Sequence, residues 1–211
     1  MESQKQVWNK IADDWKEFRE KPIKEVIEFL KTKTGKVLDL GSGAGRHLIK
    51  IKSGQMYLVD FSEKMIALTK QKAKKNKIRA EFFVADFNSL CFEKDFFDSA
   101  IFIDSLHCIE KKQNRTRIVK ELFKALKPKA EVFVSLWNKN SKRFENSQKE
   151  KIIKWKNKGE RYYYLYSEKQ AHKEFEKQGF KIKKSFSRDM KIMFIVIKEK
   201  LFSSNKQKIY K

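Results

Sequence analysis

The chain has 211 residues, and its 50 Lys and Arg against 27 Asp and Glu give a formal net charge of +23. This length favours one domain, and a 40% hydrophobic fraction with 18 Phe excludes a disordered chain. Two cysteines exclude a disulfide framework and a four-cysteine zinc site, and no apolar run reaches the roughly 18 residues that span a membrane. The polar N-terminus lacks the apolar centre of a secretory signal, so we expect a soluble cytoplasmic protein.

The positive charge is concentrated in the C-terminal third. Residues 139–211 hold 22 basic and 8 acidic residues, a net charge of +14, whereas residues 1–138 have a net charge of +9. A strongly basic surface attracts polyanions, and nucleic acid is the first candidate because phosphate contacts release counterions. A lysine-rich composition without functional meaning would give the same charge. Charge alone leaves both interpretations open.

The predicted elements alternate between helices and strands along the first two thirds of the chain. Helices are predicted by apolar spacing and capping over residues 6–30 with a break at Pro22, over 45–51, after the N-cap Ser62, and over 113–126. Strands are predicted over residues 36–40, 55–61, 80–85, 97–103 and 131–137. This alternation predicts a parallel sheet with helices on both faces.

Two further strands are predicted near the C-terminus, over residues 180–186 and 191–198. The link between them is only residues 187–190, so they should form a hairpin with an antiparallel strand at or near one edge of the sheet. Between strand 131–137 and this hairpin lies a long basic segment, residues 138–179, which we expect to be partly helical. The expected fold class is therefore α/β with seven strands.

A glycine turn follows the first strand. The sequence from Asp39 to Gly45 is DLGSGAG, with glycine at every second position. Glycine permits positive φ and lets a ligand lie against the backbone, and the N–H groups of a following helix would face a polar ligand. A dinucleotide-binding fingerprint would place its third glycine at position 46, which is Arg, and the nucleotide-triphosphate motif is absent. A turn with a purely structural role remains an alternative.

Acidic residues end the next two predicted strands. Asp60 follows the second strand, where a carboxylate accepts both hydroxyls of a ribose. Asp86 follows the third, with Phe87 beside it, where a carboxylate accepts from an exocyclic adenine amine. Each Asp alone is more often a helix cap or a surface residue. Together with the glycine turn, they lie at the sheet edge where open α/β sheets bind ligands.

At this point residues 35–138 resemble the class I S-adenosylmethionine-dependent methyltransferases. The resemblance is carried by VLDLGSGAG, LVDFS, VADFNSL, FDSAIFIDSLHCI and LKPKAEVFVSLW. It implies a Rossmann-like, mostly parallel seven-stranded sheet and S-adenosyl-L-methionine as the cofactor. It also implies a set of cofactor-binding residues, namely Asp39, Gly41, Ser42, Gly43, Gly45, Asp60, Phe61, Asp86, Phe87 and Ile103.

The flanking segments resemble the tRNA wobble-uridine carboxymethyl methyltransferases, which include the methyltransferase module of the AlkB-fused animal enzymes. The resemblance spans about residues 7–200 and rests on Val7-Trp8, Ile11-Ala12, Arg19, Pro22, His107, Trp137 and the stretch RYYYLY from Arg161 to Tyr166. Some positions depart from the family pattern. Lys21 stands in place of a Trp, Cys108 in place of a second His, and Tyr164 in place of the His of RYYH, and Pro128-Lys129-Ala130 replaces the usual Pro-Gly-Gly turn.

The resemblance implies methyl transfer to the carboxylate of a carboxymethyluridine or a related wobble uridine. A carboxylate is already ionised at pH 7 and needs no general base, so positioning and charge complementarity should carry catalysis. The implied catalytic residues are Arg19, His107 and Arg161, and the implied substrate-binding residues are Arg19, Asp104, Trp137, Arg161, Tyr162 and Tyr163, with no metal. Alternatively, Arg161 pairs with an acid, His107 starts a helix, Asp104 caps a turn, and the tyrosines are core aromatics.

The resemblance also implies partners and a domain organisation. The partners are tRNA and a small zinc-ribbon activator protein, with the lysines of residues 149–158 facing the anticodon stem, and a membrane is not expected. Residues 1–34 would form a helical substrate-side segment, 35–200 the methyltransferase domain with a basic insertion at 138–179, and 201–211 a flexible tail. The alternatives are a small-molecule methyltransferase and a non-catalytic RNA-binding module on the same fold. With these flanks, we favour RNA binding as the meaning of the charge.

Overall fold

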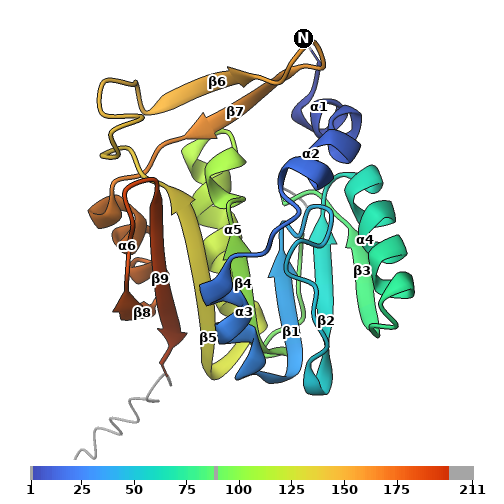
Figure 1. The fold of residues 1–211 in the computed structure, drawn as a ribbon. Helices are drawn as coiled ribbons and strands as arrows, with labels where there is room; N and C mark the ends of the chain where they lie inside the picture. The colour runs from blue at the N-terminus through green and yellow to red at the C-terminus, as the bar shows by residue number, and fades with distance from the viewer. Residues whose placement is uncertain (1, 88–89, 200–211) are drawn as a thin grey trace, which may run out of the picture.

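The computed structural model describes residues 2–87 and 90–199. A seven-stranded sheet forms its centre, in the order β3-β2-β1-β4-β5-β9-β8 (Figure 1). Its strands are β1 (Thr34–Leu40), β2 (Lys52–Asp60), β3 (Ala80–Val84), β4 (Phe97–Ile103), β5 (Leu126–Trp137), β8 (Phe180–Ser185) and β9 (Lys191–Lys198). The helices are α1 (Gln4–Lys10), α2 (Ala12–Phe18), α3 (Lys24–Lys31), α4 (Glu63–Lys75), α5 (Lys112–Ala125) and α6 (Glu168–Glu176), with a 3-10 turn, η1 (Leu106–Cys108).

The sheet is parallel except at β9, which runs antiparallel to both of its neighbours, β5 and β8. The predicted C-terminal hairpin and the predicted fold class are confirmed. Apolar residues alternate between the two faces along β1. Leu38 packs on the side of α5 and α6, and Val37 packs on the side of α3. Burial on both faces is why the central strands read as nearly continuous apolar runs.

The predicted helix after the glycine turn is wrong. Residues 41–47 form successive turns, and β2 begins at Lys52. Only residues 46–51 separate Gly45 from β2. This connection is too short for a stable helix, because helix nucleation is unfavourable, and the same residues must also return the chain to the start of the next parallel strand. Side chains hold this connection instead: Nε2 of His47 accepts from the backbone N–H of Ile23 at 3.3 Å.

The basic segment 138–179 contains a second, two-stranded sheet that the sequence analysis did not predict. Its strands are β6 (Glu150–Lys154) and β7 (Glu160–Tyr164), paired antiparallel, and α6 follows. The RYYY sequence therefore lies on a strand. The hairpin extends across the carboxyl-terminal edge of the main sheet towards α1 (Figure 1), where the side chain of Gln4 bonds the backbone of Glu160 and of Tyr162.

The N-terminal segment is broken twice, and not only at Pro22. Ile11 ends α1 and precedes α2, so the predicted continuous helix becomes two short helices before the bend at residue 21. Within the residues described, no helix combines the length and the apolarity needed to cross a membrane. The predicted flexible tail, 201–211, lies outside the described residues.

Candidate active site

A cavity of about 1170 Å³ opens at the carboxyl-terminal edge of the parallel strands. Its floor is built from the ends of β1, β2 and β4, and its roof from α1, α2 and the β6–β7 hairpin. Nine of the ten predicted cofactor-binding residues line it, namely Asp39, Gly41, Ser42, Gly43, Asp60, Phe61, Asp86, Phe87 and Ile103. Gly45 lies outside the lining, against Thr69 of α4. The cofactor-binding residues predicted from the sequence are thus brought together in one cavity.

The glycine turn forms part of the cavity wall. Gly41 and Gly43 have φ values of 75° and 53°, in the left-handed region that favours glycine. A Cβ on Gly41 would lie 2.3 Å from Oγ of Ser105, so no side chain fits there. A Cβ on Gly43 would meet nothing within 4 Å. The backbone at Gly43 is therefore uncovered on this side, so a ligand can approach it closely.

Asp60 ties the end of β2 to the glycine turn. Its two carboxylate oxygens accept one backbone N–H each, from Gly43 at 2.9 Å and from Ser62 at 3.0 Å. Burial raises the pKa of Asp60 to about 6, although these amide hydrogen bonds act in the opposite direction. A carboxylate accepts about four hydrogen bonds, so Asp60, which lines the cavity, retains capacity for a ligand beyond these amides. Asp60 is therefore able to accept a diol.

Asp39 is a buried carboxyl with unmet hydrogen-bonding capacity. It is 1% exposed, and its Oδ2 has no partner among the described residues. Burial, and then the charge of Asp60, raise the pKa of Asp39 to about 8, while Lys72 acts against this rise. Oγ of Ser42 is buried and unpartnered in the same way. Buried polar atoms without partners are rare in proteins, so this part of the wall is built for a ligand that carries donors or a positive charge.

An aromatic wall completes this end of the cavity. The rings of Phe61 and Phe87 are nearly parallel, with an angle of 19° and centroids 6.5 Å apart. Asp86 stands beside them in the lining, directly before Phe87. A flat heterocycle with an amino group would find apolar faces and a carboxylate acceptor here. The predicted cofactor-binding residues thus place apolar ring faces and a hydrogen-bond acceptor together at this end of the cavity.

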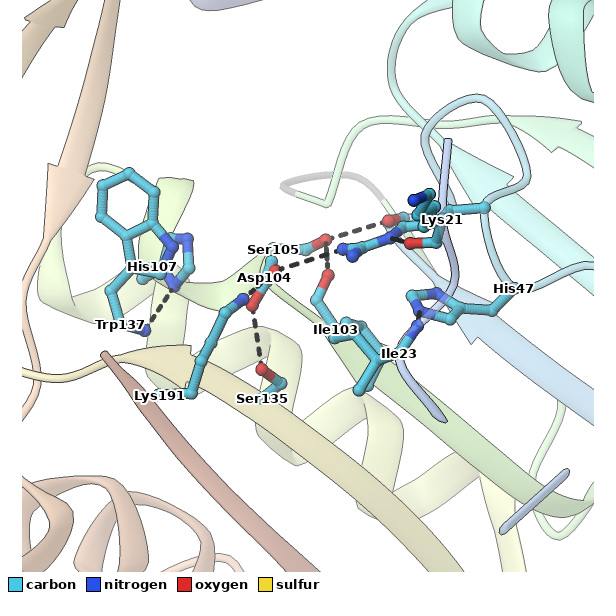
Figure 2. Close-up of polar contacts among 12 residues, drawn as sticks. Lys21, Ile23, His47, Ile103, Asp104, Ser105, His107, Ser135, Trp137 and Lys191 are labelled. Carbon is cyan, nitrogen blue, oxygen red and sulfur yellow. Dashed lines mark hydrogen bonds and ion pairs between the residues drawn. The ribbon is translucent and has the colours of Figure 1, made fainter. Parts of the chain in front are cut away.

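The other end of the cavity is organised around Asp104, which follows β4 in a left-handed conformation with a φ of 54°. Figure 2 shows its carboxylate between Ser135 and Lys191. Oγ of Ser135 donates at 2.9 Å, Lys191 forms an ion pair, and Nη1 of Arg46 lies at 3.9 Å. Burial alone would raise the pKa of Asp104, but Lys191 and the neighbouring cations hold it well below its usual value. Asp104 is therefore an ionised carboxylate that holds the cationic side chains of Lys191 and Arg46 near it.

His107 does not line the cavity. It is buried beneath it, and its Nδ1 accepts from the backbone N–H of Trp137 at 3.1 Å (Figure 2). Burial lowers the pKa of His107 to about 3, so the ring is neutral at pH 7. The neighbouring Cys108 does line the cavity. The structure thus places His107 behind the wall where the sequence analysis predicted direct contact with the acceptor.

The predicted aromatic contacts also lie behind the wall. Trp137 stacks on Tyr163, with ring centroids 4.4 Å apart and an angle of 9°, and Phe144 stacks on the other side of the same cluster. The hydroxyl of Tyr162 accepts from Arg115 at 3.4 Å. Trp137, Tyr162 and Tyr163 are buried, and none belongs to the cavity lining. Their positions are those of core aromatics, the alternative considered from the sequence.

Arg161 is a buried cation without an acidic partner. It is 3% exposed, and in the described part of the chain no carboxylate forms an ion pair with it. Its Nη1 donates to the hydroxyl of Tyr163 at 2.5 Å, its Nε has no partner, and its guanidinium lies 4.8 Å from the ring centroid of Trp155 and 5.0 Å from that of Trp15. Burial lowers the pKa of Arg161. The alternative that Arg161 pairs with an acid is not what the structure shows.

Arg19 stands at the cavity itself. Its guanidinium lies over the rings of Trp15 and Phe18, and its Nε is buried without a partner. Arg19 is therefore a guanidinium with an unmet donor at the cavity wall, whereas Arg161 lies outside the lining, behind Trp15. Sequence reasoning missed Trp155 beside Arg161, Lys191 and Arg46 beside Asp104, and Lys72 at the glycine turn, because their contacts join segments far apart in the chain.

Strand order, a glycine turn and two acids at the carboxyl edge define a Rossmann-like domain that binds a nucleoside-containing cofactor. The comparisons with known proteins refine this class. The family model described as a methyltransferase domain matches residues 31–184, which is most of the chain. The chain therefore belongs to the methyltransferase domain family.

Curated relatives are distant. "Probable tRNA methyltransferase 9B" from Homo sapiens is 26% identical over 153 residues, which are 71% of this chain and 32% of that protein. A tRNA (carboxymethyluridine(34)-5-O)-methyltransferase from Arabidopsis thaliana is 29% identical over 133 residues, 62% of this chain and 31% of that protein. The chain thus spans about a third of the length of these relatives.

Solved structures share the fold. A methyltransferase from Methanosarcina mazei named as S-adenosylmethionine-dependent matches with a TM-score of 0.70 at 20% identity, over 84% of this chain and 99% of that one. A Haloferax volcanii methyltransferase solved in complex with the Trm112 methyltransferase activator matches with a TM-score of 0.69 at 14% identity, over 95% of this chain and all of that one. At these identities the likeness concerns the fold.

Proposed function

We propose that this chain is an S-adenosylmethionine-dependent methyltransferase that methylates the carboxylate of carboxymethyluridine, or of a related wobble uridine, in tRNA. Membership of the methyltransferase domain family supports the reaction class. The names of the human and Arabidopsis relatives, together with the flanking motifs of the sequence, support tRNA as the substrate. The net charge of +23 supports a polyanionic partner.

The cofactor end of the cavity fits S-adenosylmethionine. When bound, this cofactor supplies a methyl group on a positively charged sulfur. The unpartnered Oδ2 of Asp39 suits its ammonium group, the remaining acceptor capacity of Asp60 suits its ribose hydroxyls, and Asp86 suits its adenine amine. Phe61 and Phe87 offer apolar faces to the adenine ring. The bare backbone at Gly43 leaves room for the methionine portion.

We call the end of the cavity around Asp104 and Arg19 the acceptor end. Three groups there that could act as a base, His107, His47 and Asp104, are already engaged, and this observation carries the choice of a carboxylate. A neutral imidazole has one acceptor nitrogen. In His107 that nitrogen receives the N–H of Trp137, and in His47 it receives the N–H of Ile23. The carboxylate of Asp104 is held by Lys191 and Ser135. An acceptor that must lose a proton finds no ready base among these three groups, whereas an ionised carboxylate needs none.

The two guanidinium groups supply the positioning that such an acceptor requires. Arg19 at the cavity wall and Arg161 behind Trp15 both hold an unpartnered Nε. A guanidinium binds a carboxylate through two parallel hydrogen bonds and fixes its orientation. Since the acceptor oxygen is already nucleophilic, holding it in line with the methyl group is the main task of the protein. A small-molecule acid remains the alternative acceptor under this geometry.

A small zinc-ribbon activator forms part of the proposal. β3 is an edge strand of the main sheet, and its residues Phe83 and Val84 are 46% and 45% exposed. An edge strand with exposed apolar side chains is a template for pairing with another chain. The Haloferax volcanii methyltransferase of the same fold is named as a complex with an activator. We further propose that residues 1–34 and the insertion 138–179 form the acceptor side and that the protein acts in the cytoplasm.

The proposal is tested by methyl transfer from labelled cofactor to tRNA that carries carboxymethyluridine, with and without the activator subunit. We expect label in the wobble nucleoside, identified by mass spectrometry, and none in tRNA that lacks the carboxymethyl group. If carboxymethyl tRNA stays unlabelled under both conditions, the tRNA assignment is wrong. Binding of the cofactor without transfer to tRNA would favour a small-molecule acid, and binding of tRNA without cofactor binding would favour a non-catalytic module.

A further inference from the structure

Three aromatic rings form a shelf on the outer surface beside Arg19. Trp15 and Phe18 come from α2, and Trp155 comes from the turn between β6 and β7. Their ring centroids are 5.8 Å apart for Trp15 and Phe18, 5.3 Å for Trp15 and Trp155, and 5.1 Å for Phe18 and Trp155. We call these three residues the aromatic shelf. It joins the N-terminal segment to the basic insertion.

Phe18 is the exposed member of the shelf, and Trp15 and Trp155 are half-buried. Phe18 is 62% exposed, the highest value among the exposed large apolar residues of the described chain. A shallow hollow of about 370 Å³ lies over Phe18 and Trp155. Because Phe18 contacts the partly exposed rings of Trp15 and Trp155, the three form a contiguous apolar patch, and such patches mark interaction sites.

The shelf is continuous with the acceptor end of the cavity. The guanidinium of Arg19 lies 5.1 Å from the ring centroid of Phe18 and 5.4 Å from that of Trp15, and Arg19 itself lines the cavity. Arg161 contacts Trp15 and Trp155 from the inner side. A nucleotide chain whose acceptor group reached Arg19 would therefore bring its next nucleotide over the shelf.

Cations surround the shelf on the hairpin side. Residues 149–161 hold six basic and two acidic side chains, a net charge of +4. Asp14 and Glu17 also border the hollow, but Lys156 and Lys158 both pair with Asp14, and Lys158 above all lowers the pKa of Asp14 to about 2. Lys154 is 80% exposed, and its one ion pair in the described chain, with the exposed Glu160, is long at 3.8 Å. Exposed aromatic rings beside lysines are the usual arrangement for binding single-stranded nucleic acid.

We propose that the aromatic shelf stacks an unpaired base of the tRNA anticodon loop that adjoins the methylated nucleotide. This inference rests on the proposed function and adds a site to it. Stacking on an aromatic face tolerates every base, so the shelf contributes affinity and orientation and leaves the choice of acceptor to the cavity. Lys154 contacts the backbone phosphates beside the stacked base.

The test uses an anticodon stem-loop RNA with the fluorescent base 2-aminopurine next to the wobble position. We expect the fluorescence to be quenched on binding and the Phe18→Ala variant to remove the quenching and raise Kd by about tenfold, within the range for loss of one stacked base. Phe18→Trp should restore both. Lys154→Ala should weaken binding and reduce its dependence on salt, whereas Lys177→Ala, an exposed lysine next to α6, serves as the matched control.

The outcomes separate this inference from the proposed function. If Phe18→Ala leaves quenching and Kd unchanged while the unmodified protein methylates tRNA, the shelf proposal is wrong and the function stands. If the unmodified protein neither binds the stem-loop nor methylates tRNA, both are wrong. If the protein self-associates and Phe18→Ala abolishes only that association, the shelf is a contact between copies of the chain, and the base-stacking proposal is overturned.

Discussion

The ammonium nitrogen of Lys72 lies 2.7 Å from the carbonyl oxygen of Gly45. One turn earlier on α4, the hydroxyl of Thr69 donates to the carbonyl of Gly43 at 2.8 Å. No helix follows the glycine turn, and among the described residues the only backbone N–H that reaches either carbonyl is that of Leu48, 3.2 Å from the Gly45 oxygen. The side chains of Lys72 and Thr69 on α4 therefore supply hydrogen-bond donors that a helix would otherwise provide. They hold the turn in the conformation that faces the cofactor end of the cavity.

The first prediction concerns this anchor. Replacing Lys72 by Met should weaken binding of S-adenosylmethionine about fivefold, since a charged hydrogen bond is worth about 1.5–3 kcal/mol before a discount for the partial exposure of Lys72. Lys70→Met, on an exposed face of the same helix, is the matched control. Calorimetric titration with the cofactor measures both. Equal affinities in the two variants would show that Lys72 does not hold the turn.

The second prediction is a pH dependence of stability that arises from Asp39. Its pKa rises from 3.8 to about 8 in the folded chain, so between these values the native state keeps a proton that the unfolded chain has released. The free energy of unfolding should therefore fall as pH rises from 4 to 8, and Asp60, with a pKa of about 6, adds to the fall in the lower part of this range.

The Asp39→Asn variant removes the larger part of this dependence. We expect it to be more stable than the unmodified protein at pH 8, by roughly 1–3 kcal/mol, because the buried charge no longer forms. The same variant should bind the cofactor more weakly, since Oδ2 of Asp39 is the unpartnered acceptor at that end. Thermal unfolding from pH 5 to pH 8 gives the measurement. Parallel stability profiles for the two proteins would contradict the buried-charge explanation.

Local patterns were sufficient to predict much of the fold. Strands β4 and β9 begin and end where the apolar runs indicated, and Ser62 caps α4 by accepting the N–H of Met65. The helix predicted over residues 45–51 does not form, because only residues 46–51 connect the glycine turn to β2. The β6–β7 hairpin was missed because lysines obscure its alternation of polar and apolar residues.

The candidate site was predictable where it depends on strand ends, and less so where it depends on distant contacts. Asp39, Asp60 and Asp86 end parallel strands, so their meeting at one edge follows from topology. No local pattern shows that Trp137 stacks on Tyr163, because they lie 26 positions apart on β5 and β7, with β6 between them. A motif identifies such residues without revealing whether their side chains face the cavity or the core.

The third prediction concerns the ion pair between Asp104 and Lys191, both mostly buried. Lys191→Met should destabilise the fold by about 3 kcal/mol, because it leaves a buried carboxylate without its main cation. Adding Asp104→Asn to this variant should recover most of the loss. Urea denaturation at pH 7 measures the effect, and Lys183→Met, which breaks a more exposed pair with Glu131, should cost less than about 1 kcal/mol. Similar losses in the two lysine variants would argue against the role of burial.

Acid sensitivity provides a second measurement of the same pair. The pKa of Asp104 is depressed in the folded chain, so its contribution to stability is present above the unfolded value of 3.8 and is lost as pH falls below it. In Lys191→Met the carboxylate should protonate at higher pH. We therefore expect the single variant to regain stability relative to the unmodified protein as pH falls from 7 to 4. A constant difference between the two across that range would contradict this account.

The fourth prediction separates the catalytic role of Arg161 from a structural one. Arg161→Leu removes a buried charge that has no acidic partner, so we expect the free energy of unfolding to stay the same or to increase. Under the proposed function, the same change should reduce methyl transfer to tRNA at least tenfold and leave cofactor affinity intact, because Arg161 lies behind Trp15 and not beside the cofactor-binding residues. Arg161→Lys should not restore transfer, since an ammonium cannot reproduce the paired hydrogen bonds of a guanidinium. The control is Arg143→Leu, which removes an exposed arginine beside Phe144 and should leave transfer unchanged. If Arg161→Leu loses stability and transfer in proportion, Arg161 serves the aromatic cluster around it and not the acceptor.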